Sequence, residues 1–257
     1  MSTGPATIEL ERYQERLWQV RVDVAGRPCR FLFDVGAGIT SLDARVADEL
    51  GLREVGRVAA FRMTGSRLEL GVLPRTHLAL AGRSLGSRPL GRTDFSRILP
   101  PGWPPVDGIL ALDALVDVPF TVDFARDTMT LGPPLDTSGL RPLTVRPYRQ
   151  VPSLSLVILV AVECPAEDLW FELDNSNVGP IVIAPKAAAR LGIPRTTEPR
   201  MREIRVRGLG PISCPVFVRD LIYDGNLGNL FASPRRFAFD LAADRVLAGT
   251  STAPRQG

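Results

Sequence analysis

The chain has 257 residues, of which 45% are hydrophobic and 23% are charged, so it can form one large or two modest globular domains with a buried core. A formal net charge of +3, with arginines spread along the chain and not clustered with aromatic residues, predicts no nucleic-acid partner. The three cysteines lie far apart without a Cys-x-x-Cys spacing, which indicates neither a disulfide framework nor a zinc site.

The apolar segments give no sign of a membrane partner. Residues 1–12 lack the apolar core that a signal peptide needs. The longest apolar run, residues 154–162, is too short to span a bilayer and is interrupted by Ser155. We therefore expect a cytoplasmic protein.

Short β-rich runs separated by Gly and Pro dominate the first half. Residues 17–24 alternate, a turn follows, and an apolar run over 29–33 ends at Asp34, which predicts a hairpin leading into a loop. Residues 43–50 have helical spacing and end before Gly51, a plausible C-terminal cap. Five further strands are predicted at residues 57–63, 67–73, 76–80, 120–124 and 128–131.

The second half repeats this order after a stretch rich in Gly and Pro. That stretch, residues 132–150, is interpreted as a linker between two lobes. Residues 170–173 then run into Asp174, and a short helix is predicted over 184–191, ending before Gly192. The order of strand, Asp, loop and short helix is thus written twice.

The ends of the two halves match more closely still. Asp107-Gly-Ile-Leu corresponds to Asp224-Gly-Asn-Leu, and the same ungapped spacing then holds to the ends of the following strands. It pairs three further positions: Phe120 with Phe237, Asp123 with Asp240, and Asp127 with Asp244. Agreement without a gap indicates an internal duplication.

Each half also places one Asp at the end of an apolar strand: Asp34-Val-Gly-Ala in the first and Asp174-Asn-Ser-Asn in the second. This pattern resembles the retropepsin-like and pepsin-like aspartic proteases, whose signature is an apolar strand, Asp-Thr/Ser-Gly-Ala, a short helix and a later apolar-apolar-Gly loop. The resemblance covers both halves. It implies a mostly β fold of two pseudo-symmetric β-barrel lobes with about one short helix each, residues 1–135 with a flap and residues 136–257.

The resemblance implies that Asp34 and Asp174 meet at the lobe interface as a catalytic dyad, without a metal or cofactor. Two carboxyl groups about 3 Å apart cannot both ionise, so they share one proton and supply the acid and the base for hydrolysis of a peptide by water. The flap is expected over residues 61–70. The residues expected to bind substrate are those of the flap tip and the two Asp loops: Thr64, Gly65, Ser66, Gly36, Ala37, Asn175 and Ser176.

The two Asp loops depart from the family pattern in ways that bear on function. Val35 and Asn175 stand where the family has Thr or Ser, so one hydroxyl of an interlobe pair is absent and the other is replaced by an amide. Ser176 replaces a Gly, and it would carry strain if the loop required a positive φ there.

The leading hypothesis is a monomeric aspartic endopeptidase acting on a peptide or protein substrate. The first alternative is a non-catalytic peptide-binding or scaffolding module that keeps the cleft and has lost the chemistry. The second is a purely structural β protein whose cleft has closed. The departures at the two Asp loops leave these alternatives open.

Overall fold

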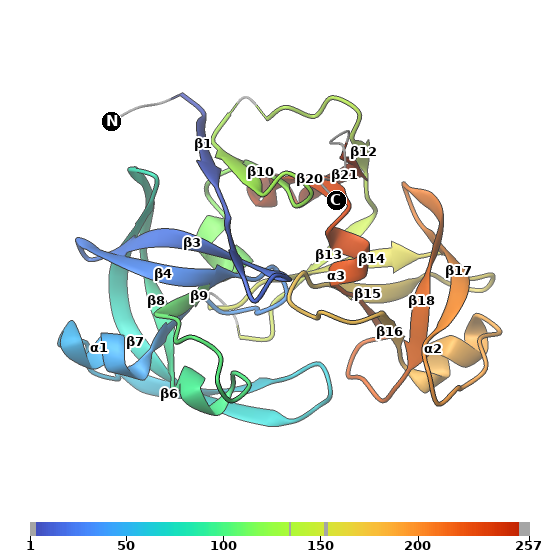
Figure 1. Ribbon diagram of the computed structural model, residues 1–257, viewed down its shortest axis with the longest axis horizontal. Helices are drawn as coiled ribbons and strands as arrows, with labels where there is room; N and C mark the ends of the chain where they lie inside the picture. The colour runs from blue at the N-terminus through green and yellow to red at the C-terminus, as the bar shows by residue number, and fades with distance from the viewer. Residues whose placement is uncertain (1–3, 134, 152–153, 252–257) are drawn as a thin grey trace.

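The computed structural model describes residues 4–133, 135–151 and 154–251, and its strands form three sheets (Figure 1). None of the helices in the described part of the chain has the length and apolar character needed to cross a bilayer. The predicted mostly β, two-lobed architecture is confirmed.

The first lobe is a closed barrel. Its strands follow one another around the ring in the order β3 (Leu17–Val24), β4 (Arg27–Phe33), β9 (Gly108–Leu110), β5 (Ser41–Asp43), β8 (Arg83–Thr93) and β7 (Arg67–Leu80). The ring closes because β3 also pairs with β7. Two outer strands, β2 (Glu11–Tyr13) and β6 (Gly56–Phe61), pair with β3 and β7.

The second lobe repeats this barrel. Its ring runs β14 (Val157–Val162), β15 (Leu169–Leu173), β19 (Gly225–Leu227), β16 (Ile181–Ile183), β18 (Gly210–Val218) and β17 (Arg200–Val206). It closes through the pairing of β14 with β17. An outer strand, β13 (Val145–Tyr148), pairs with β14 as β2 pairs with β3. The strand order around the two rings is therefore the same.

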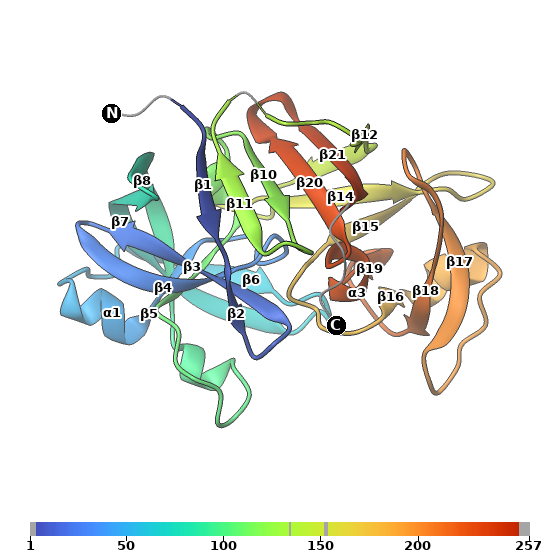
Figure 2. The ribbon, with the colours of Figure 1, turned by 45° about the horizontal axis from the view of Figure 1, so that its top comes forward.

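A third sheet of six strands lies across both lobes (Figure 2). Its order is β1 (Ala6–Glu9), β11 (Thr128–Leu131), β10 (Phe120–Asp123), β20 (Arg235–Asp240), β21 (Arg245–Thr250) and β12 (Arg141–Pro142). The central pair, β10 and β20, places Phe120 opposite Phe239, and the two buried rings stack with their centroids 4.7 Å apart. This sheet joins the lobes through backbone hydrogen bonds and a shared apolar core.

Equivalent hydrogen bonds hold the two Asp loops. The backbone N–H of Asp34 donates to the carbonyl of Leu110 at 3.0 Å, and that of Asp174 donates to the carbonyl of Leu227 at 3.1 Å. Asp127 and Asp244, which the sequence pairs, both have left-handed backbones, with φ values of 54° and 49°. The two lobes therefore correspond residue by residue at these points, and duplication as their origin stays a prediction.

The two predicted helices are present. Helix α1 (Ala44–Glu49) begins after Asp43, whose carboxylate accepts a hydrogen bond from the N–H of Arg45, and it ends before Gly51 at φ +67°. Helix α2 (Pro185–Arg190) has Pro at its start and ends before Gly192 at φ +66°. The remaining helical segments are α3 (Asn229–Ala232), η1 (Phe95–Arg97), η2 (Leu112–Leu115) and η3 (Leu241–Ala243).

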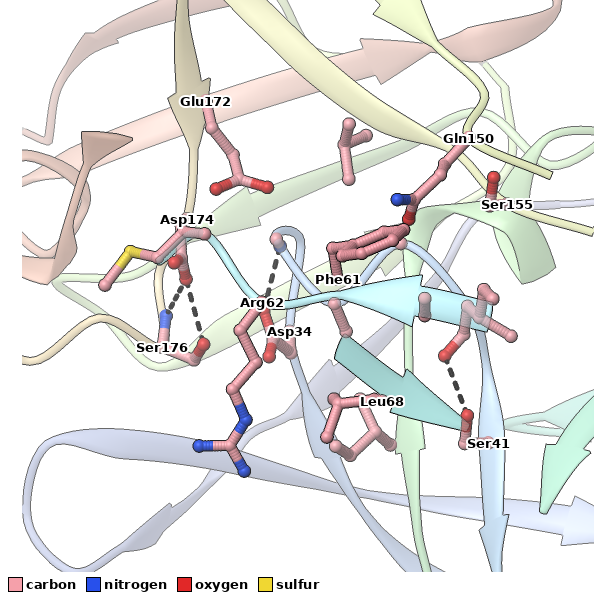
Figure 3. Close-up of a pocket in the computed structure, with 18 of the residues that line it drawn as sticks. Asp34, Ser41, Phe61, Arg62, Leu68, Gln150, Ser155, Glu172, Asp174 and Ser176 are labelled. Carbon is pink, nitrogen blue, oxygen red and sulfur yellow. Dashed lines mark hydrogen bonds between the residues drawn. The ribbon is translucent and has the colours of Figure 1, made fainter. Parts of the chain in front are cut away.

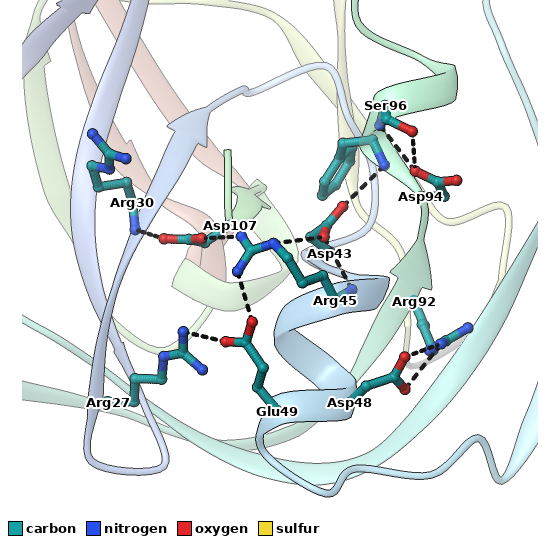
Figure 4. A network of polar contacts seen from close by, with 11 residues as sticks. Arg27, Arg30, Asp43, Arg45, Asp48, Glu49, Arg92, Asp94, Ser96 and Asp107 are labelled. Carbon is teal, nitrogen blue, oxygen red and sulfur yellow. Dashed lines mark hydrogen bonds and ion pairs between the residues drawn. The ribbon is translucent and has the colours of Figure 1, made fainter. Parts of the chain in front are cut away.

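A polar network fastens α1 to the first barrel (Figure 4). Arg45 donates to Asp107 at 2.8 Å and to Glu49 at 3.0 Å, while Glu49 also pairs with Arg27 at 2.5 Å. Asp107 in turn accepts from the N–H of Arg30 at 2.9 Å, just as Asp224 accepts from the N–H of Trp170 in the second lobe. The network is solvent-exposed, so we assign it mainly to positioning, since exposed ion pairs contribute about 0–1 kcal/mol each.

The strands differ from the sequence prediction in three details. The predicted strands 67–73 and 76–80 are one strand, β7, because a register shift between Leu73 and Thr76 accommodates Pro74. Strand β8 was missed, since its glycines and Pro89 interrupt the alternating pattern. The predicted linker contains β12 and β13, whose prolines are tolerated because both strands lie at sheet edges.

Candidate active site

Asp34 and Asp174 follow β4 and β15, the equivalent strands of the two barrels, and both line one cavity of about 470 Å³. Each strand is apolar and buried, and each pairs in parallel with the short strand that carries the Leu110 or Leu227 carbonyl. The barrel topology therefore delivers one carboxyl group from each lobe to the same place. The sequence resemblance implied this juxtaposition.

The two carboxyl groups are held in the same manner (Figure 3). The N–H of Gly36 donates to Oδ1 of Asp34 at 2.8 Å, and the N–H of Ser176 donates to Oδ1 of Asp174 at 2.8 Å. Asp174 receives more: its Oδ1 also accepts from the Ser176 hydroxyl at 2.9 Å, and its Oδ2 accepts from the amide of Asn226 at 2.9 Å.

The loop of Asp34 touches Asp174 directly at Gly36. A Cβ at position 36 would lie 2.6 Å from Cγ of Asp174, closer than real Cβ atoms come to other heavy atoms. The backbone of Gly36 has no positive φ, so the need for Gly is one of space and not of conformation. Ala37 lines the cavity beside it.

Burial raises the pKa of Asp34 to about 7, and the neighbouring charge of Asp174 adds to this rise. The hydroxyl of Ser176 and the N–H groups of Gly36 and Ala37 act in the opposite direction on the pKa of Asp34. Ser176 thus interacts with both carboxyl groups. A pair of this kind retains one proton up to near-neutral pH, which is what acid and base catalysis by two carboxyl groups requires.

Asn175 links the two loops across the lobe interface. Its buried amide donates to the carbonyl of Phe33 at 2.8 Å and accepts from the N–H of Val35 at 2.8 Å. A single side chain therefore satisfies a donor and an acceptor of the opposite loop. The side chain of Val35 makes no equivalent hydrogen bond to the loop of Asp174, because it is apolar; it is also buried. Asn175 lies behind the cavity and does not line it.

The strain expected at Ser176 is absent. Ser176 has no positive φ, so the loop tolerates a Cβ there. The reason is that its N–H reaches Asp174 from an ordinary backbone conformation, as that of Gly36 reaches Asp34. The condition under which strain was expected is therefore not met, and the Ser adds a hydroxyl group to the loop.

The fold is similar to that of a solved enzyme, the aspartic proteinase from Irpex lacteus. The two structures superpose with a TM-score of 0.57, covering 97% of this chain and 98% of that one, at 13% sequence identity. This chain has the fold of an aspartic proteinase. No protein-family model matches the sequence, and no curated protein matches it either. At this level of identity the likeness shows the fold.

Within the aspartic-proteinase fold, the hairpin of β6 and β7 forms one wall of the cavity. Its turn is closed by the N–H of Arg62 donating to the carbonyl of Ser66 at 2.9 Å, and Gly65 occupies the left-handed region at φ +84°. Phe61, Arg62, Met63 and Leu68 line the cavity. Thr64, Gly65 and Ser66 lie at the tip, outside the cavity lining. Their role in substrate binding stays a prediction.

The tip of this hairpin contacts the second lobe. The N–H of Ile222 donates to the carbonyl of Met63 at 2.9 Å, and a Cβ added at Gly65 would lie 3.4 Å from Cγ2 of Ile222. The hairpin therefore closes over the cavity and is held there by the opposite lobe.

Sequence reasoning missed a third acidic residue in the cavity. Glu172 lies in β15 two residues before Asp174, and its side chain is 4% exposed. The amide of Asn226 donates to Oε2 of Glu172 at 3.0 Å as well as to Asp174. Burial, and then the charge of Asp174, hold the pKa of Glu172 well above its usual range. The signal was available: an acidic residue in an otherwise apolar strand, on the same face as Asp174.

Proposed function

We propose that this protein is an aspartic endopeptidase, with Asp34 and Asp174 as its catalytic residues. The observation that carries the proposal is the convergence of the two carboxyl groups from equivalent strand ends onto one hairpin-covered cavity. The raised pKa of Asp34, at about 7, supports a shared proton under mild conditions.

In the proposed reaction, the ionised carboxylate takes a proton from a water molecule while the protonated carboxyl group donates its proton to the carbonyl oxygen of the scissile peptide bond. The water oxygen bonds to the carbonyl carbon and gives a tetrahedral diol. The carbon–nitrogen bond then breaks as the protonated carboxyl group gives its proton to the amine nitrogen and the ionised one takes a proton from a hydroxyl of the diol, which leaves a carboxylic acid, a free amine and a singly protonated dyad. Because the two groups titrate as a pair, neither is assigned as the permanent acid or base.

The test is cleavage of a broad library of extended peptides, followed by mass spectrometry. Wild type should cleave, Asp34→Asn and Asp174→Asn should not, and the exposed Asp117→Asn serves as a matched control that should behave like wild type. Activity should be highest on the acid side and decline as pH rises through about 7, where Asp34 loses its proton. Cleavage that persists in Asp34→Asn, or that a chelator abolishes, would refute the mechanism.

The second candidate is a peptide-binding module without hydrolysis, and the hydroxyl of Ser176 favours it. That hydroxyl donates to Asp174 and also affects the pKa of Asp34, so it takes up hydrogen-bonding capacity that an attacking water would use. Ser176→Gly, alone and with Asn175→Thr and Val35→Thr, separates the candidates. A gain of hydrolysis identifies a protease limited by its loops. Peptide binding with no hydrolysis in any variant identifies the binding module.

A further inference from the structure

Glu172 is the buried group in the cavity that the proposed chemistry leaves without a role. Its Oε2 accepts the hydrogen bond from Asn226, whereas its Oε1 has no hydrogen-bond partner among the described residues. The side chain nevertheless lines the cavity, and Figure 3 shows its carboxyl group pointing into it from the strand that leads to Asp174. Glu172 is 4% exposed, and only one of its two carboxyl oxygens has a hydrogen-bond partner among the described residues. Burying such a group lowers the stability of the fold unless a further group, such as a bound ligand, interacts with the second oxygen.

The first barrel does without such an acid at the equivalent place. There Leu32, two residues before Asp34, lies opposite Ile109 on the neighbouring strand, and both are apolar. In the second barrel Glu172 lies opposite Asn226 in the same register. Equivalent positions in the two barrels are thus occupied by an apolar pair in the first lobe and a polar pair in the second. The barrel itself does not need the acid, so its place in the cavity points to a ligand.

The surroundings of Glu172 suit a positive charge. The rings of Tyr148 and Tyr223 also line this side of the cavity and meet edge to face, with their centroids 6.1 Å apart. Ring faces of this kind attract cations. The Asp34 and Asp174 pair, which is proposed to share one proton, adds one further negative charge nearby. Arg62, on the hairpin of β6 and β7, also lines the cavity, but its side chain is exposed and makes no ion pair with these carboxyl groups or with any other described residue.

The opposite wall has a different character. It is formed largely by apolar side chains of the first lobe, including Ile39, Leu68 and Leu70. Among the described residues, no group of His, Cys, Asp and Glu is arranged so that it could hold a metal ion. The complementary ligand is therefore an organic cation on the second-lobe side, joined to an apolar group on the first-lobe side.

We propose that Glu172, with Tyr148 and Tyr223, forms a subsite for a Lys or Arg side chain of the peptide substrate, beside the scissile bond on the side of the second lobe. The proposal rests on the proposed function, because it takes the cavity as a peptide cleft. It makes the enzyme selective for peptides with an apolar residue on one side of the cleaved bond and a basic residue on the other.

The experiment compares peptides that carry Lys or norleucine at each position around the cleaved bond. At one position kcat/KM should favour Lys about tenfold or more in wild type, because a charged hydrogen bond is lost with norleucine. In Glu172→Gln, which keeps an oxygen for Asn226, the ratio should fall to near one. The exposed Glu203→Gln, in the same lobe, should keep the wild-type ratio. An unchanged Lys preference in Glu172→Gln, or no Lys preference in wild type, overturns the subsite.

A binding measurement separates failure of the subsite from failure of the proposed function. Calorimetry with the Asp34→Asn protein should give tighter binding of the Lys peptide than of the norleucine peptide, and adding Glu172→Gln should remove the difference. If wild type cleaves nothing while this difference is observed, the protease proposal fails and the cationic subsite stands. If both peptides bind equally in both proteins, the subsite is refuted whatever the outcome for cleavage.

Discussion

Asp34 holds its proton more tightly in the folded protein because the fold buries its carboxyl group and places it near the charge of Asp174. Its pKa rises from 3.8 to about 7 on folding. The folded protein therefore binds more protons than the unfolded chain between these values. The stability that the proton on Asp34 contributes is fully present below the unfolded pKa and is lost as pH rises through about 7.

This linkage predicts that Asp34→Asn is relatively more stable at pH 8 than at pH 4, because Asn cannot ionise. We expect the Tm of the variant, measured against wild type by calorimetry, to gain several degrees between the two pH values, since each 1 kcal/mol shifts Tm by about 2–4 °C in a chain of this size. Asp113, whose pKa burial also raises, is present in both proteins and cancels in the comparison. A Tm difference that does not change with pH would contradict the assignment.

Sequence alone could locate Asp34 and Asp174, because an Asp at the end of an apolar strand recurs in both halves. It could not tell how Asn175 would behave. An amide in place of a hydroxyl indicates only that the interlobe contact differs, whereas the structure shows the amide donating to the carbonyl of Phe33 and accepting from the N–H of Val35 in the opposite loop. The sequence also could not show why position 36 is Gly. Asp174, which is distant in sequence, lies against Gly36 and leaves no room for a side chain.

At the scale of elements, Gly65 determines how well the hairpin of β6 and β7 fits against the second lobe. Its φ of +84° is one that residues with a Cβ adopt at a cost, and an added methyl would meet Ile222 of the other lobe. Gly65→Ala should therefore weaken the closed position and lower kcat/KM about fivefold, the effect of about 1 kcal/mol.

The turn between β7 and β8 provides a matched control for this change. Gly82 has a similar φ of +74° in the same lobe, and nothing lies within 4 Å of its added Cβ. Gly82→Ala should carry a similar backbone cost, visible in thermal unfolding, without affecting kcat/KM. Equal kinetic effects of the two variants would show that the hairpin contact with Ile222 has no part in turnover.

Elements with regular local signals were predictable, and those set by tertiary pairing were not. The helix ends followed from Gly51 and Gly192, whose positive φ values end each helix. Strand β8 pairs with β7 over most of its length despite glycines and a proline that weaken its own strand signal. Its existence depends on a partner strand, which is information that a local pattern does not hold.

The whole molecule is the pseudo-symmetric pair of barrels that the repeated sequence pattern predicted, and its departures from symmetry lie at the cavity. A closing hairpin extends from the first lobe, and the pair Leu32 and Ile109 is replaced by Glu172 and Asn226 in the second. Repetition in the sequence could predict the shared architecture. It could not predict which wall of the cavity is polar, because that depends on which residues of neighbouring strands lie opposite each other in each barrel.

Because one chain supplies both carboxyl groups and completes the six-stranded sheet, we predict a monomer. Light scattering should give 28.0 kDa across a wide range of concentrations. A mixing experiment tests the same point at the site: Asp34→Asn and Asp174→Asn proteins, each inactive, should stay inactive when combined, since neither chain can lend its intact carboxyl group to the other. A dimer mass, together with activity restored by mixing, would mean that the working cavity forms between two chains. A dimer mass without restored activity would place any association away from the cavity, and the dyad would still belong to a single chain.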